Sequence, residues 1–334
     1  MRPLRAYRLR LERKARRWRA HAKSFQLAPL AQRTGRIRPG DILLFATIRN
    51  EAVRLPFFLD YYRRLGVGHF LFVDNDSTDG GAGFLADQAD CSVWVTGAGY
   101  RQARYGMDWM NHLLGRYGSG HWTLTVDADE FLVYPHMDSR PLAALCDWLD
   151  AAGLKAYGAL LIDLYPRGPL SGAVLGPRVD PVTVAPYFDA ASYQLRRDAR
   201  HGNLWIQGGP RQRVHFADRP ELAPALNKIP LVRWRSHYAY VSSTHALLPR
   251  GLNRVYEEWG GEKPCGALLH AKFVHLLGEK AAEELRRRQH YAGAREYAAY
   301  ARQMDRPLWT PRSTRYEGWR QLHGLGLISA GGWL

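Results

Sequence analysis

The stretch Thr125-Val126-Asp127-Ala128-Asp129-Glu130-Phe131 decides the fold, because it places two carboxylates at the end of an apolar run. Residues 122–126 are mostly β-branched or aromatic and follow a Gly-Ser-Gly turn, which predicts a buried strand. Because side chains alternate along a strand, Asp127 and Asp129 project from the same side. Like charges this close repel unless a cation lies between them, and carboxylate oxygens suit Mg²⁺ or Mn²⁺. The alternative is an ordinary strand-end turn, in which Asp is common.

Two further predicted strands also end in polar residues. Residues 42–46 are apolar and lead into 47–51, and residues 69–73 are apolar and lead into 74–81. Between them, residues 52–65 have the apolar spacing of a helix and stop at a glycine. Ligands of open α/β sheets bind beyond the carboxyl ends of the strands, so the three polar strand ends are expected to form one site.

These strand ends carry a family resemblance. Thr47-x-Arg49-Asn50-Glu51, the run 74–79 and Asp127-x-Asp129 resemble the three donor-site motifs of family 2 glycosyltransferases with the GT-A fold. The match is to the branch whose acidic motif reads D-x-D-E-F. It is specific over about residues 41–135 and looser through the C-terminal half. The second motif of that family usually begins with two adjacent Asp residues, whereas this chain has Asn75 after Asp74.

The resemblance implies a fold and a donor site. The fold is a GT-A (Rossmann-like) α/β/α sandwich with a mostly parallel central sheet and a loop-rich C-terminal acceptor half. Asp129 would bind a Mn²⁺ or Mg²⁺ ion directly, and Asp127 would approach both the ion and the ribose. Arg104, Arg211 and Lys228 could offset phosphate charge, or could be ordinary surface cations. The residues expected to line the nucleotide sugar are Thr47, Arg49, Asn50, Glu51, Asp74, Asp76, Asp127, Arg104 and Lys228.

The resemblance also indicates a third metal ligand. GT-A enzymes often supply one from the C-terminal part, and His270 follows an apolar run there. A neutral imidazole at a strand end can complete a metal site begun by two carboxylates. His245 is the second choice, and an ordinary hydrogen-bonded structural histidine is the alternative for either.

The implied activity is the transfer of a sugar from a nucleotide diphosphate to a cell-envelope glycan or a lipid-linked acceptor. A cation bridging the diphosphate oxygens stabilises the charge that develops on the leaving group. Family resemblance indicates inversion at the anomeric carbon, which needs a general base near the acceptor hydroxyl. Glu130 and Asp163 are the candidates for this base, and Glu130 could instead support its neighbours.

Two other functions remain open. A nucleotidyltransferase acting on sugar phosphates would share the sheet and the metal, but it should carry a Gly-rich basic loop after the first strand. Residues 47–55 contain no glycine. A non-catalytic protein that binds anionic lipid or nucleic acid would explain a basic N-terminus, but it would leave Asp127 and Asp129 without a role.

Positive charge is concentrated at the N-terminus. Residues 1–40 hold thirteen Lys or Arg and one acid, a net +12, which leaves +4 of the total +16 for the other 294 residues. Basic side chains there surround one apolar stripe of a predicted helix, formed by Leu4, Tyr7, Leu11, Ala15, Trp18, Ala22 and Phe25. A basic amphipathic helix predicts binding of an anionic membrane surface through residues 1–30. A solvated tail or a helix packed on its own domain is the alternative, and without a recognition signature nucleic acid is not expected.

Three segments are expected: a basic helix and linker at 1–40, a nucleotide-sugar-binding half at 41–165, and an acceptor-binding half with a C-terminal helical region at 166–334. No apolar run of about 18 residues and no signal peptide is found. Cys91, Cys146 and Cys265 lack motif spacing and are expected to be free thiols. We therefore expect a cytoplasmic protein, peripheral at the inner face of the membrane.

Overall fold

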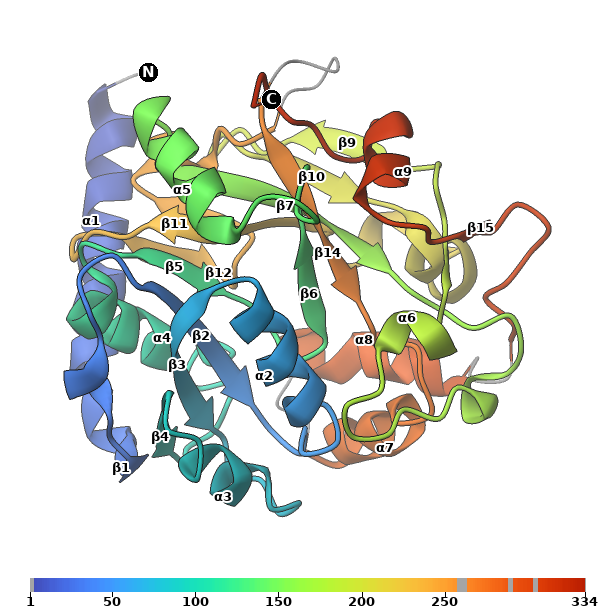
Figure 1. Ribbon diagram of the computed structural model, residues 1–334, viewed down its shortest axis with the longest axis horizontal. Coiled ribbons are helices and arrows are strands. Elements are labelled where there is room, and N and C mark those ends of the chain that lie inside the picture. Colours follow the sequence, from blue (N-terminus) through green and yellow to red (C-terminus); the bar gives the residue numbers. More distant parts are fainter. Residues whose placement is uncertain (1–2, 257–262, 288–290, 303–305, 334) are drawn as a thin grey trace.

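The computed structural model describes residues 3–256, 263–287, 291–302 and 306–333. A nine-stranded sheet runs through the molecule in the order β1-β4-β3-β2-β5-β11-β7-β14-β6 (Figure 1). Six strands run in one direction, and β1, β11 and β6 run against them. The expected α/β fold with a large, mostly parallel sheet is confirmed. The strands are β1 (Ala28–Ala31), β2 (Ile42–Ile48), β3 (Val67–Asp74), β4 (Cys91–Val95), β5 (Trp122–Thr125), β6 (Glu130–Val133), β7 (Ala156–Asp163), β11 (Asn227–Arg233) and β14 (Cys265–His270).

Helices cover both faces of the sheet, because its central strands are apolar on both sides. On β2, Leu44 and Ala46 enter one core layer, while Leu43 and Phe45 enter the other. The first layer is closed by α2 (Leu55–Arg64), α3 (Gly81–Ala86), α5 (Leu142–Ala151) and α9 (Trp319–Gly324), and the second by α4 (Met107–Leu113). Alternation along each strand thus produces the three layers of the expected sandwich.

Both halves of the chain build the central sheet. β11 and β14 come from the C-terminal half, yet β11 pairs with β5 and β7, and β14 pairs with β7 and β6. The boundary expected at residue 165 therefore does not divide the sheet into two structural units. The division into a donor half and an acceptor half stays a prediction about function. The remaining elements are α6 (Pro181–Val184), α7 (Leu277–Arg287) and α8 (Tyr291–Arg302), with the strand pairs β8 (Tyr187–Phe188) and β15 (Thr314–Arg315), β9 (Gln194–Arg197) and β10 (Leu204–Gln207), and β12 (Ala239–Ser242) and β13 (Ala246–Leu248).

Two local features qualify the expected organisation. The linker expected within residues 1–40 contains β1, which pairs antiparallel with β4 at the sheet edge. Strand β10 ends at Gln207. Gly208 and Gly209 follow with φ of +148° and +65°, and a Cβ at Gly208 would lie 2.6 Å from the carbonyl oxygen of Ser192. Only glycine permits that backbone path, and it turns the chain away from the sheet.

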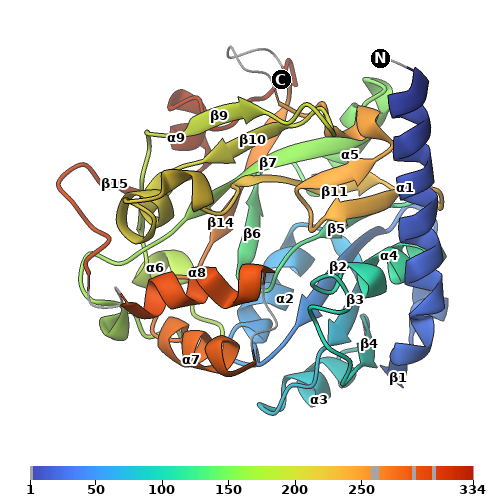
Figure 2. The same ribbon diagram turned by 180° about the vertical axis from the view of Figure 1, so that it is seen from behind.

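The N-terminal segment forms a helix, α1 (Pro3–Ala22), that lies along one side of the molecule (Figure 2). Leu9 on this helix is buried in a small cluster with Val241, Ala246 and Leu248. Arg19 pairs with Asp108 of α4 at 2.7 Å. The helix therefore packs on its own domain through a face opposite to its apolar stripe.

The apolar stripe of α1 is left on the surface. Leu4, Trp18 and Phe25 are 74%, 72% and 83% exposed. Burying such side chains in an apolar medium is favourable by about 1.5–3 kcal/mol each, so a packed domain helix normally turns them inward. No helix in the described ranges is long and apolar enough to cross a membrane.

Candidate active site

The candidate site is a cavity of about 850 Å³ beyond the carboxyl ends of β2, β3, β5 and β14. Figure 2 shows α7 and α8 lying past the end of β14. Lys280 and Glu284 of α7 and Tyr297 of α8 line the cavity on that side. Residues 127–130, β11 and the segment 205–225 supply the other walls. The three polar strand ends predicted from the sequence thus converge at this edge of the sheet.

The acidic motif forms the floor of the cavity. Asp127 is 57% exposed, whereas Asp129 and Glu130 are largely buried. Lys228, on β11, places its Nζ 2.8 Å from Glu130 Oε1 and 3.5 Å from Asp127 Oδ2. Burial raises the pKa of Glu130, and the Lys228 ammonium opposes that rise. Lys228 therefore compensates the repulsion between carboxylates that the sequence implies.

His270 lies between two carboxylates. Register places it opposite Asp163 on β7 and opposite Glu130 on β6. Its Nδ1 lies 2.6 Å from Asp163 Oδ1, and its Nε2 lies 3.4 Å from Asp129 Oδ2. Burial disfavours the charged imidazole, but Asp129 and Asp163 outweigh burial and raise its pKa. His270 is therefore fixed in orientation, with Nε2 directed at the acidic motif.

Asp163 has both carboxylate oxygens engaged. Oδ1 is held by His270, and Oδ2 accepts a hydrogen bond from Arg211 Nε at 2.7 Å. Burial tends to raise the pKa of Asp163, but Arg211 and His270 together more than offset it and keep the pKa below the usual range. Arg211 is itself buried and lies 3.6 Å from Glu296 Oε1 of α8.

The Asp129 and His270 pair fits a divalent cation in part. Two ligands about 2.1 Å from one octahedral ion lie about 3 Å apart, close to the 3.4 Å between Asp129 Oδ2 and His270 Nε2. A ligating imidazole usually donates its other N–H to a carboxylate, as His270 can to Asp163. Within the described ranges no three His, Cys, Asp or Glu side chains already converge on one point. Asp127 would have to turn from Lys228 to join the pair.

The first motif contributes three polar residues to the cavity. Thr47, Arg49 and Glu51 line it, and Thr47 Oγ1 is buried without a hydrogen-bond partner among the described residues. Arg49 and Asn50 also hold α7 against the sheet: Arg49 Nε donates to Glu283 Oε1 at 2.6 Å, and Asn50 Nδ2 donates to Glu283 Oε2 at 3.1 Å. Burial alone would lower the pKa of Arg49. The carboxylates of Glu283 and Asp76 outweigh the effect of burial, so the pKa of Arg49 is raised.

Of residues 74–76 in the second motif, only the middle residue reaches the cavity. Asn75 lines the cavity, whereas Asp74 and Asp76 do not. Asp74 is buried and accepts a hydrogen bond from the Ser77 amide at 2.9 Å, and Asp76 is 66% exposed beside Arg49. The sequence reasoning therefore missed Asn75, although its departure from the family pattern had marked the position.

Arg104 lies on a strained rim. Arg104, Tyr105 and Gly106 have φ of +56°, +59° and +77° in succession. A non-glycine residue in this region costs about 1–3 kcal/mol and persists only where its surroundings enforce it. A Cβ at Gly106 would lie 2.9 Å from Thr47 Oγ1, so this close approach requires glycine. The loop holds Arg104 at the cavity, with its Nη2 donating to the Val241 carbonyl at 3.0 Å.

Several cavity residues were not found from the sequence. Lys272 pairs with Glu296 Oε1 at 2.9 Å, and its pKa is raised because Glu296, with Tyr300 and Asp129, outweighs the effect of burial. Lys272 could have been found, because it lies two residues after His270 and a strand has a period of two. Lys280, Arg287 and Glu296 come from α7 and α8, and no local pattern connects them to the sheet.

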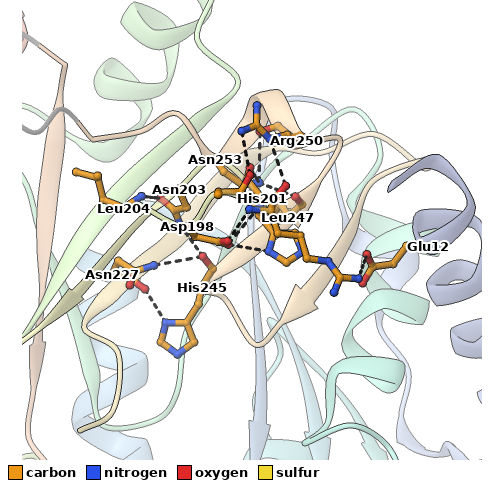
Figure 3. Close-up of polar contacts among 12 residues, drawn as sticks. Glu12, Asp198, His201, Asn203, Leu204, Asn227, His245, Leu247, Arg250 and Asn253 are labelled. Atoms are coloured by element: carbon orange, nitrogen blue, oxygen red, sulfur yellow. Dashed lines mark hydrogen bonds and ion pairs between the residues drawn. The ribbon is translucent and has the colours of Figure 1, made fainter. Parts of the chain in front are cut away.

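His245 has a structural environment, as Figure 3 shows. Its Nδ1 lies 2.6 Å from the Asn227 carbonyl oxygen, and its own carbonyl accepts a hydrogen bond from Asn203 Nδ2 at 2.6 Å. Burial lowers the pKa of His245 to about 3. Its contacts favour the structural alternative over metal binding.

Comparisons with known proteins find only distant likeness. No protein-family model and no curated protein matches the chain. A mannosyltransferase from Pyrobaculum calidifontis, solved in complex with GDP-Man and Mn²⁺, is 19% identical over 47% of this chain and 46% of that chain, with a TM-score of 0.28. Mannosyl-3-phosphoglycerate synthase from Rubrobacter xylanophilus is 21% identical over 42% of this chain and 48% of that chain, with a TM-score of 0.25. The chain thus matches about half the length of either protein.

Proposed function

We propose that this protein is a metal-dependent glycosyltransferase of the GT-A type, similar to family 2 and its D-x-D-E-F branch. It moves a sugar from a nucleotide diphosphate to a glycan or lipid-linked acceptor of the cell envelope. The observation that carries the proposal is the Asp129 and His270 pair, which lies beside Asp127 on the floor of a large cavity lined by many charged side chains. A purely structural carboxylate cluster would not need to face an open cavity.

Asp129 and His270 are the proposed anchors of a Mn²⁺ or Mg²⁺ ion, and Asp127 completes the set when the donor binds. Bound there, the ion would neutralise charge on the departing diphosphate. Asp163 is a positioning residue in this account, because it fixes the His270 ring and leaves Nε2 free to bind. Water and diphosphate oxygens would supply the other ligands of the ion, as is usual for Mg²⁺.

The nucleotide occupies the side of the cavity formed by the β2 end and Asn75. Thr47 Oγ1 offers an unused polar atom there, and Glu51 an acidic wall. Asp74 shapes the turn behind Asn75, while Arg49, Asn50 and Asp76 hold α7 in place. Arg104 and Lys228 supply positive charge toward the diphosphate, as do Lys272 and Arg211, although carboxylates already offset part of this charge.

Inversion requires a base that can accept the proton of the acceptor hydroxyl. Glu130 lines the cavity, whereas Asp163 does not. We therefore assign the base to Glu130. A pKa raised by burial brings a carboxylate nearer to the working pH, where general bases are most effective.

The acceptor would enter along the wall formed by residues 205–225. Trp205 is half-buried in this wall and presents an aromatic face near His245, with ring centroids 5.9 Å apart. Aromatic faces suit sugar rings. No Gly-rich phosphate loop follows β2, which favours sugar transfer over nucleotidyl transfer.

We also propose that α1 contacts an anionic bilayer at the inner face of the membrane. Five of the nine exposed large apolar side chains in the described ranges belong to its stripe and the residues just after it. Arg10, Lys14 and Arg17 are exposed at three- and four-residue spacing along one flank of the stripe. Apolar side chains bordered by cations match a surface of acyl chains beneath anionic headgroups.

A panel of nucleotide sugars with and without Mn²⁺ tests the proposed function. A ligand that binds only the native protein raises its melting temperature, and binding at 100 times Kd stabilises by about 2.7 kcal/mol. One donor should raise the melting temperature only when Mn²⁺ is present. If no nucleotide sugar does so, the proposed donor site is wrong.

A further inference from the structure

A second cavity, of about 550 Å³, lies between α1 and the rim of the proposed active site. Its walls carry six arginines and one glutamate, a net charge of +5. The lining residues are Arg5, Arg8, Leu9, Glu12, Ala15, Arg16, Arg19, Arg104 and Arg200. Cations gathered around a hollow repel one another, and an anion in the hollow relieves that repulsion.

The single glutamate in this cavity is already occupied. Glu12 accepts hydrogen bonds from Arg16 at 2.9 Å and from Arg200 at 2.8 Å (Figure 3 shows Glu12 on the side of α1). Arg19 is satisfied by Asp108 outside the cavity wall. The remaining positive charge of the cavity lining therefore has no carboxylate within the cavity to balance it.

Three arginines keep capacity for a ligand. Arg8 and Arg104 have no carboxylate within ion-pair distance among the described residues. Arg16 has its Nε and Nη1 buried without a hydrogen-bond partner in the same part of the chain. An unmade hydrogen bond on a buried charged group is costly, so an oxyanion that accepts from it is stabilised.

Arg104 joins the two cavities. It lines both, and its backbone is held in a left-handed conformation at the rim between them. An elongated molecule with its anionic group among the α1 arginines can therefore reach past Arg104 toward Glu130. The exposed apolar stripe lies on the same helix as these arginines. A lipid chain attached to the anionic group would therefore stay in the bilayer that the stripe is proposed to contact.

We propose that the second cavity binds a phosphate or diphosphate group of the acceptor, which makes the acceptor a phosphate ester. This inference rests on the proposed glycosyltransferase function. The arginine fork matches the oxygens of a phosphate better than those of a neutral glycan. The ester can be a membrane lipid phosphate or a soluble sugar phosphate, and the chemistry recognised is the same.

Calorimetry with inorganic pyrophosphate in EDTA tests the site without engaging the proposed metal. Arg8→Gln/Arg16→Gln should weaken pyrophosphate binding about tenfold or more, since two charge-assisted contacts are lost. Arg10→Gln/Arg17→Gln removes the same charge from the other flank of α1 and should leave binding nearly unchanged. Melting temperatures establish that each variant folds, and Arg8→Gln alone serves if the first double variant does not.

Three results would overturn the proposal. The first is failure of the wild-type protein to bind pyrophosphate, and the second is an equal loss of affinity in both double variants. The third is a change in pyrophosphate binding caused by Asp129→Ala, which alters the donor site. None of these bears on Mn²⁺-dependent binding of nucleotide sugars, so the proposed function is judged separately.

A vesicle experiment identifies the source of the phosphate. Vesicles of phosphatidylcholine with phosphatidic acid present a phosphate monoester, and vesicles with phosphatidylserine at equal charge present only diesters. A preference for phosphatidic acid that Arg8→Gln/Arg16→Gln removes identifies a lipid phosphate. Equal binding of both vesicles, with pyrophosphate binding retained, identifies a soluble phosphate ester.

Discussion

Replacing Asp163 with Asn should both destabilise the protein and weaken metal binding. Asp163 is 1% exposed and is the partner of buried Arg211, at 2.7 Å, and of His270, at 2.6 Å. Removing one partner of a buried ion pair costs about 3–5 kcal/mol, because the remaining charge is left uncompensated. Glu296 still lies 3.6 Å from Arg211, so we expect about 3 kcal/mol.

The expected shift in melting temperature follows from chain length. Unfolding entropy is about 2.1 cal/mol/K per residue, or about 0.7 kcal/mol/K for a chain of 334 residues whose two halves share one sheet. A loss of about 3 kcal/mol then lowers the melting temperature by about 4 °C. Urea denaturation and calorimetry measure both quantities. Asp147→Asn, at an exposed position on α5, is the matched control and should change little.

A double-mutant cycle separates the ion pair from other effects of the substitution. Asp163→Leu/Arg211→Met removes both charges and should cost less than the sum of the two single changes. Titration with Mn²⁺ should show affinity about 10–100-fold lower in Asp163→Asn, because His270 loses the group that orients it. An unfolding free energy within about 0.5 kcal/mol of wild type, or unchanged Mn²⁺ affinity, would refute the reasoning.

Three further predictions concern other parts of the molecule. Trp18→Ser/Phe25→Ser should lose most cosedimentation with anionic vesicles, whereas Val174→Ser, 61% exposed outside α1, should not; equal losses would contradict the α1 contact. Burial lowers the pKa of His245 to about 3, below its unfolded value of about 6.5, so its NMR signals should stay flat from pH 8 to pH 5, and a titration near pH 6.5 would contradict this. Arg104→Gly relieves left-handed strain and should raise stability by about 1 kcal/mol while weakening nucleotide-sugar binding; a drop in both would show that strain is not the main cost there.

The sequence predicts the site where local pattern and topology agree. The apolar runs before Thr47, Asp74 and Asp127 are buried strands whose carboxyl ends meet, because parallel strands bring their ends to one edge. Period-two alternation also explains the two core layers on β2. His270 could be placed at this edge because it, too, closes an apolar run.

The sequence does not predict contacts that depend on distant elements. Arg49 and Asn50 belong to a donor-site motif, yet Glu283 of α7 engages both of them. Asn75 rather than Asp74 lines the cavity, because the Ser77 amide draws Asp74 into a local turn. Such choices follow from tertiary packing, which no single motif contains.

The orientation of α1 was also beyond pattern reasoning. An apolar stripe normally predicts the buried face of a helix. Here Leu9 and Ala20 are buried instead, beside the half-buried stem of Arg16. Long basic side chains can cover apolar surface with their methylene stems, so a basic face can pack inward. The pattern alone therefore did not show which face of α1 packs on the domain.

The most direct test of the account is the release of nucleoside diphosphate from the matched nucleotide sugar by wild type, Asp129→Ala and Asp147→Ala. Wild type and Asp147→Ala should release it with Mn²⁺ and lose that activity in EDTA. Asp129→Ala should be folded and inactive under both conditions, because one anchor of the ion is missing. Full activity of wild type in EDTA, or turnover by Asp129→Ala equal to that of Asp147→Ala, would contradict the central claim that Asp129 holds a catalytic metal.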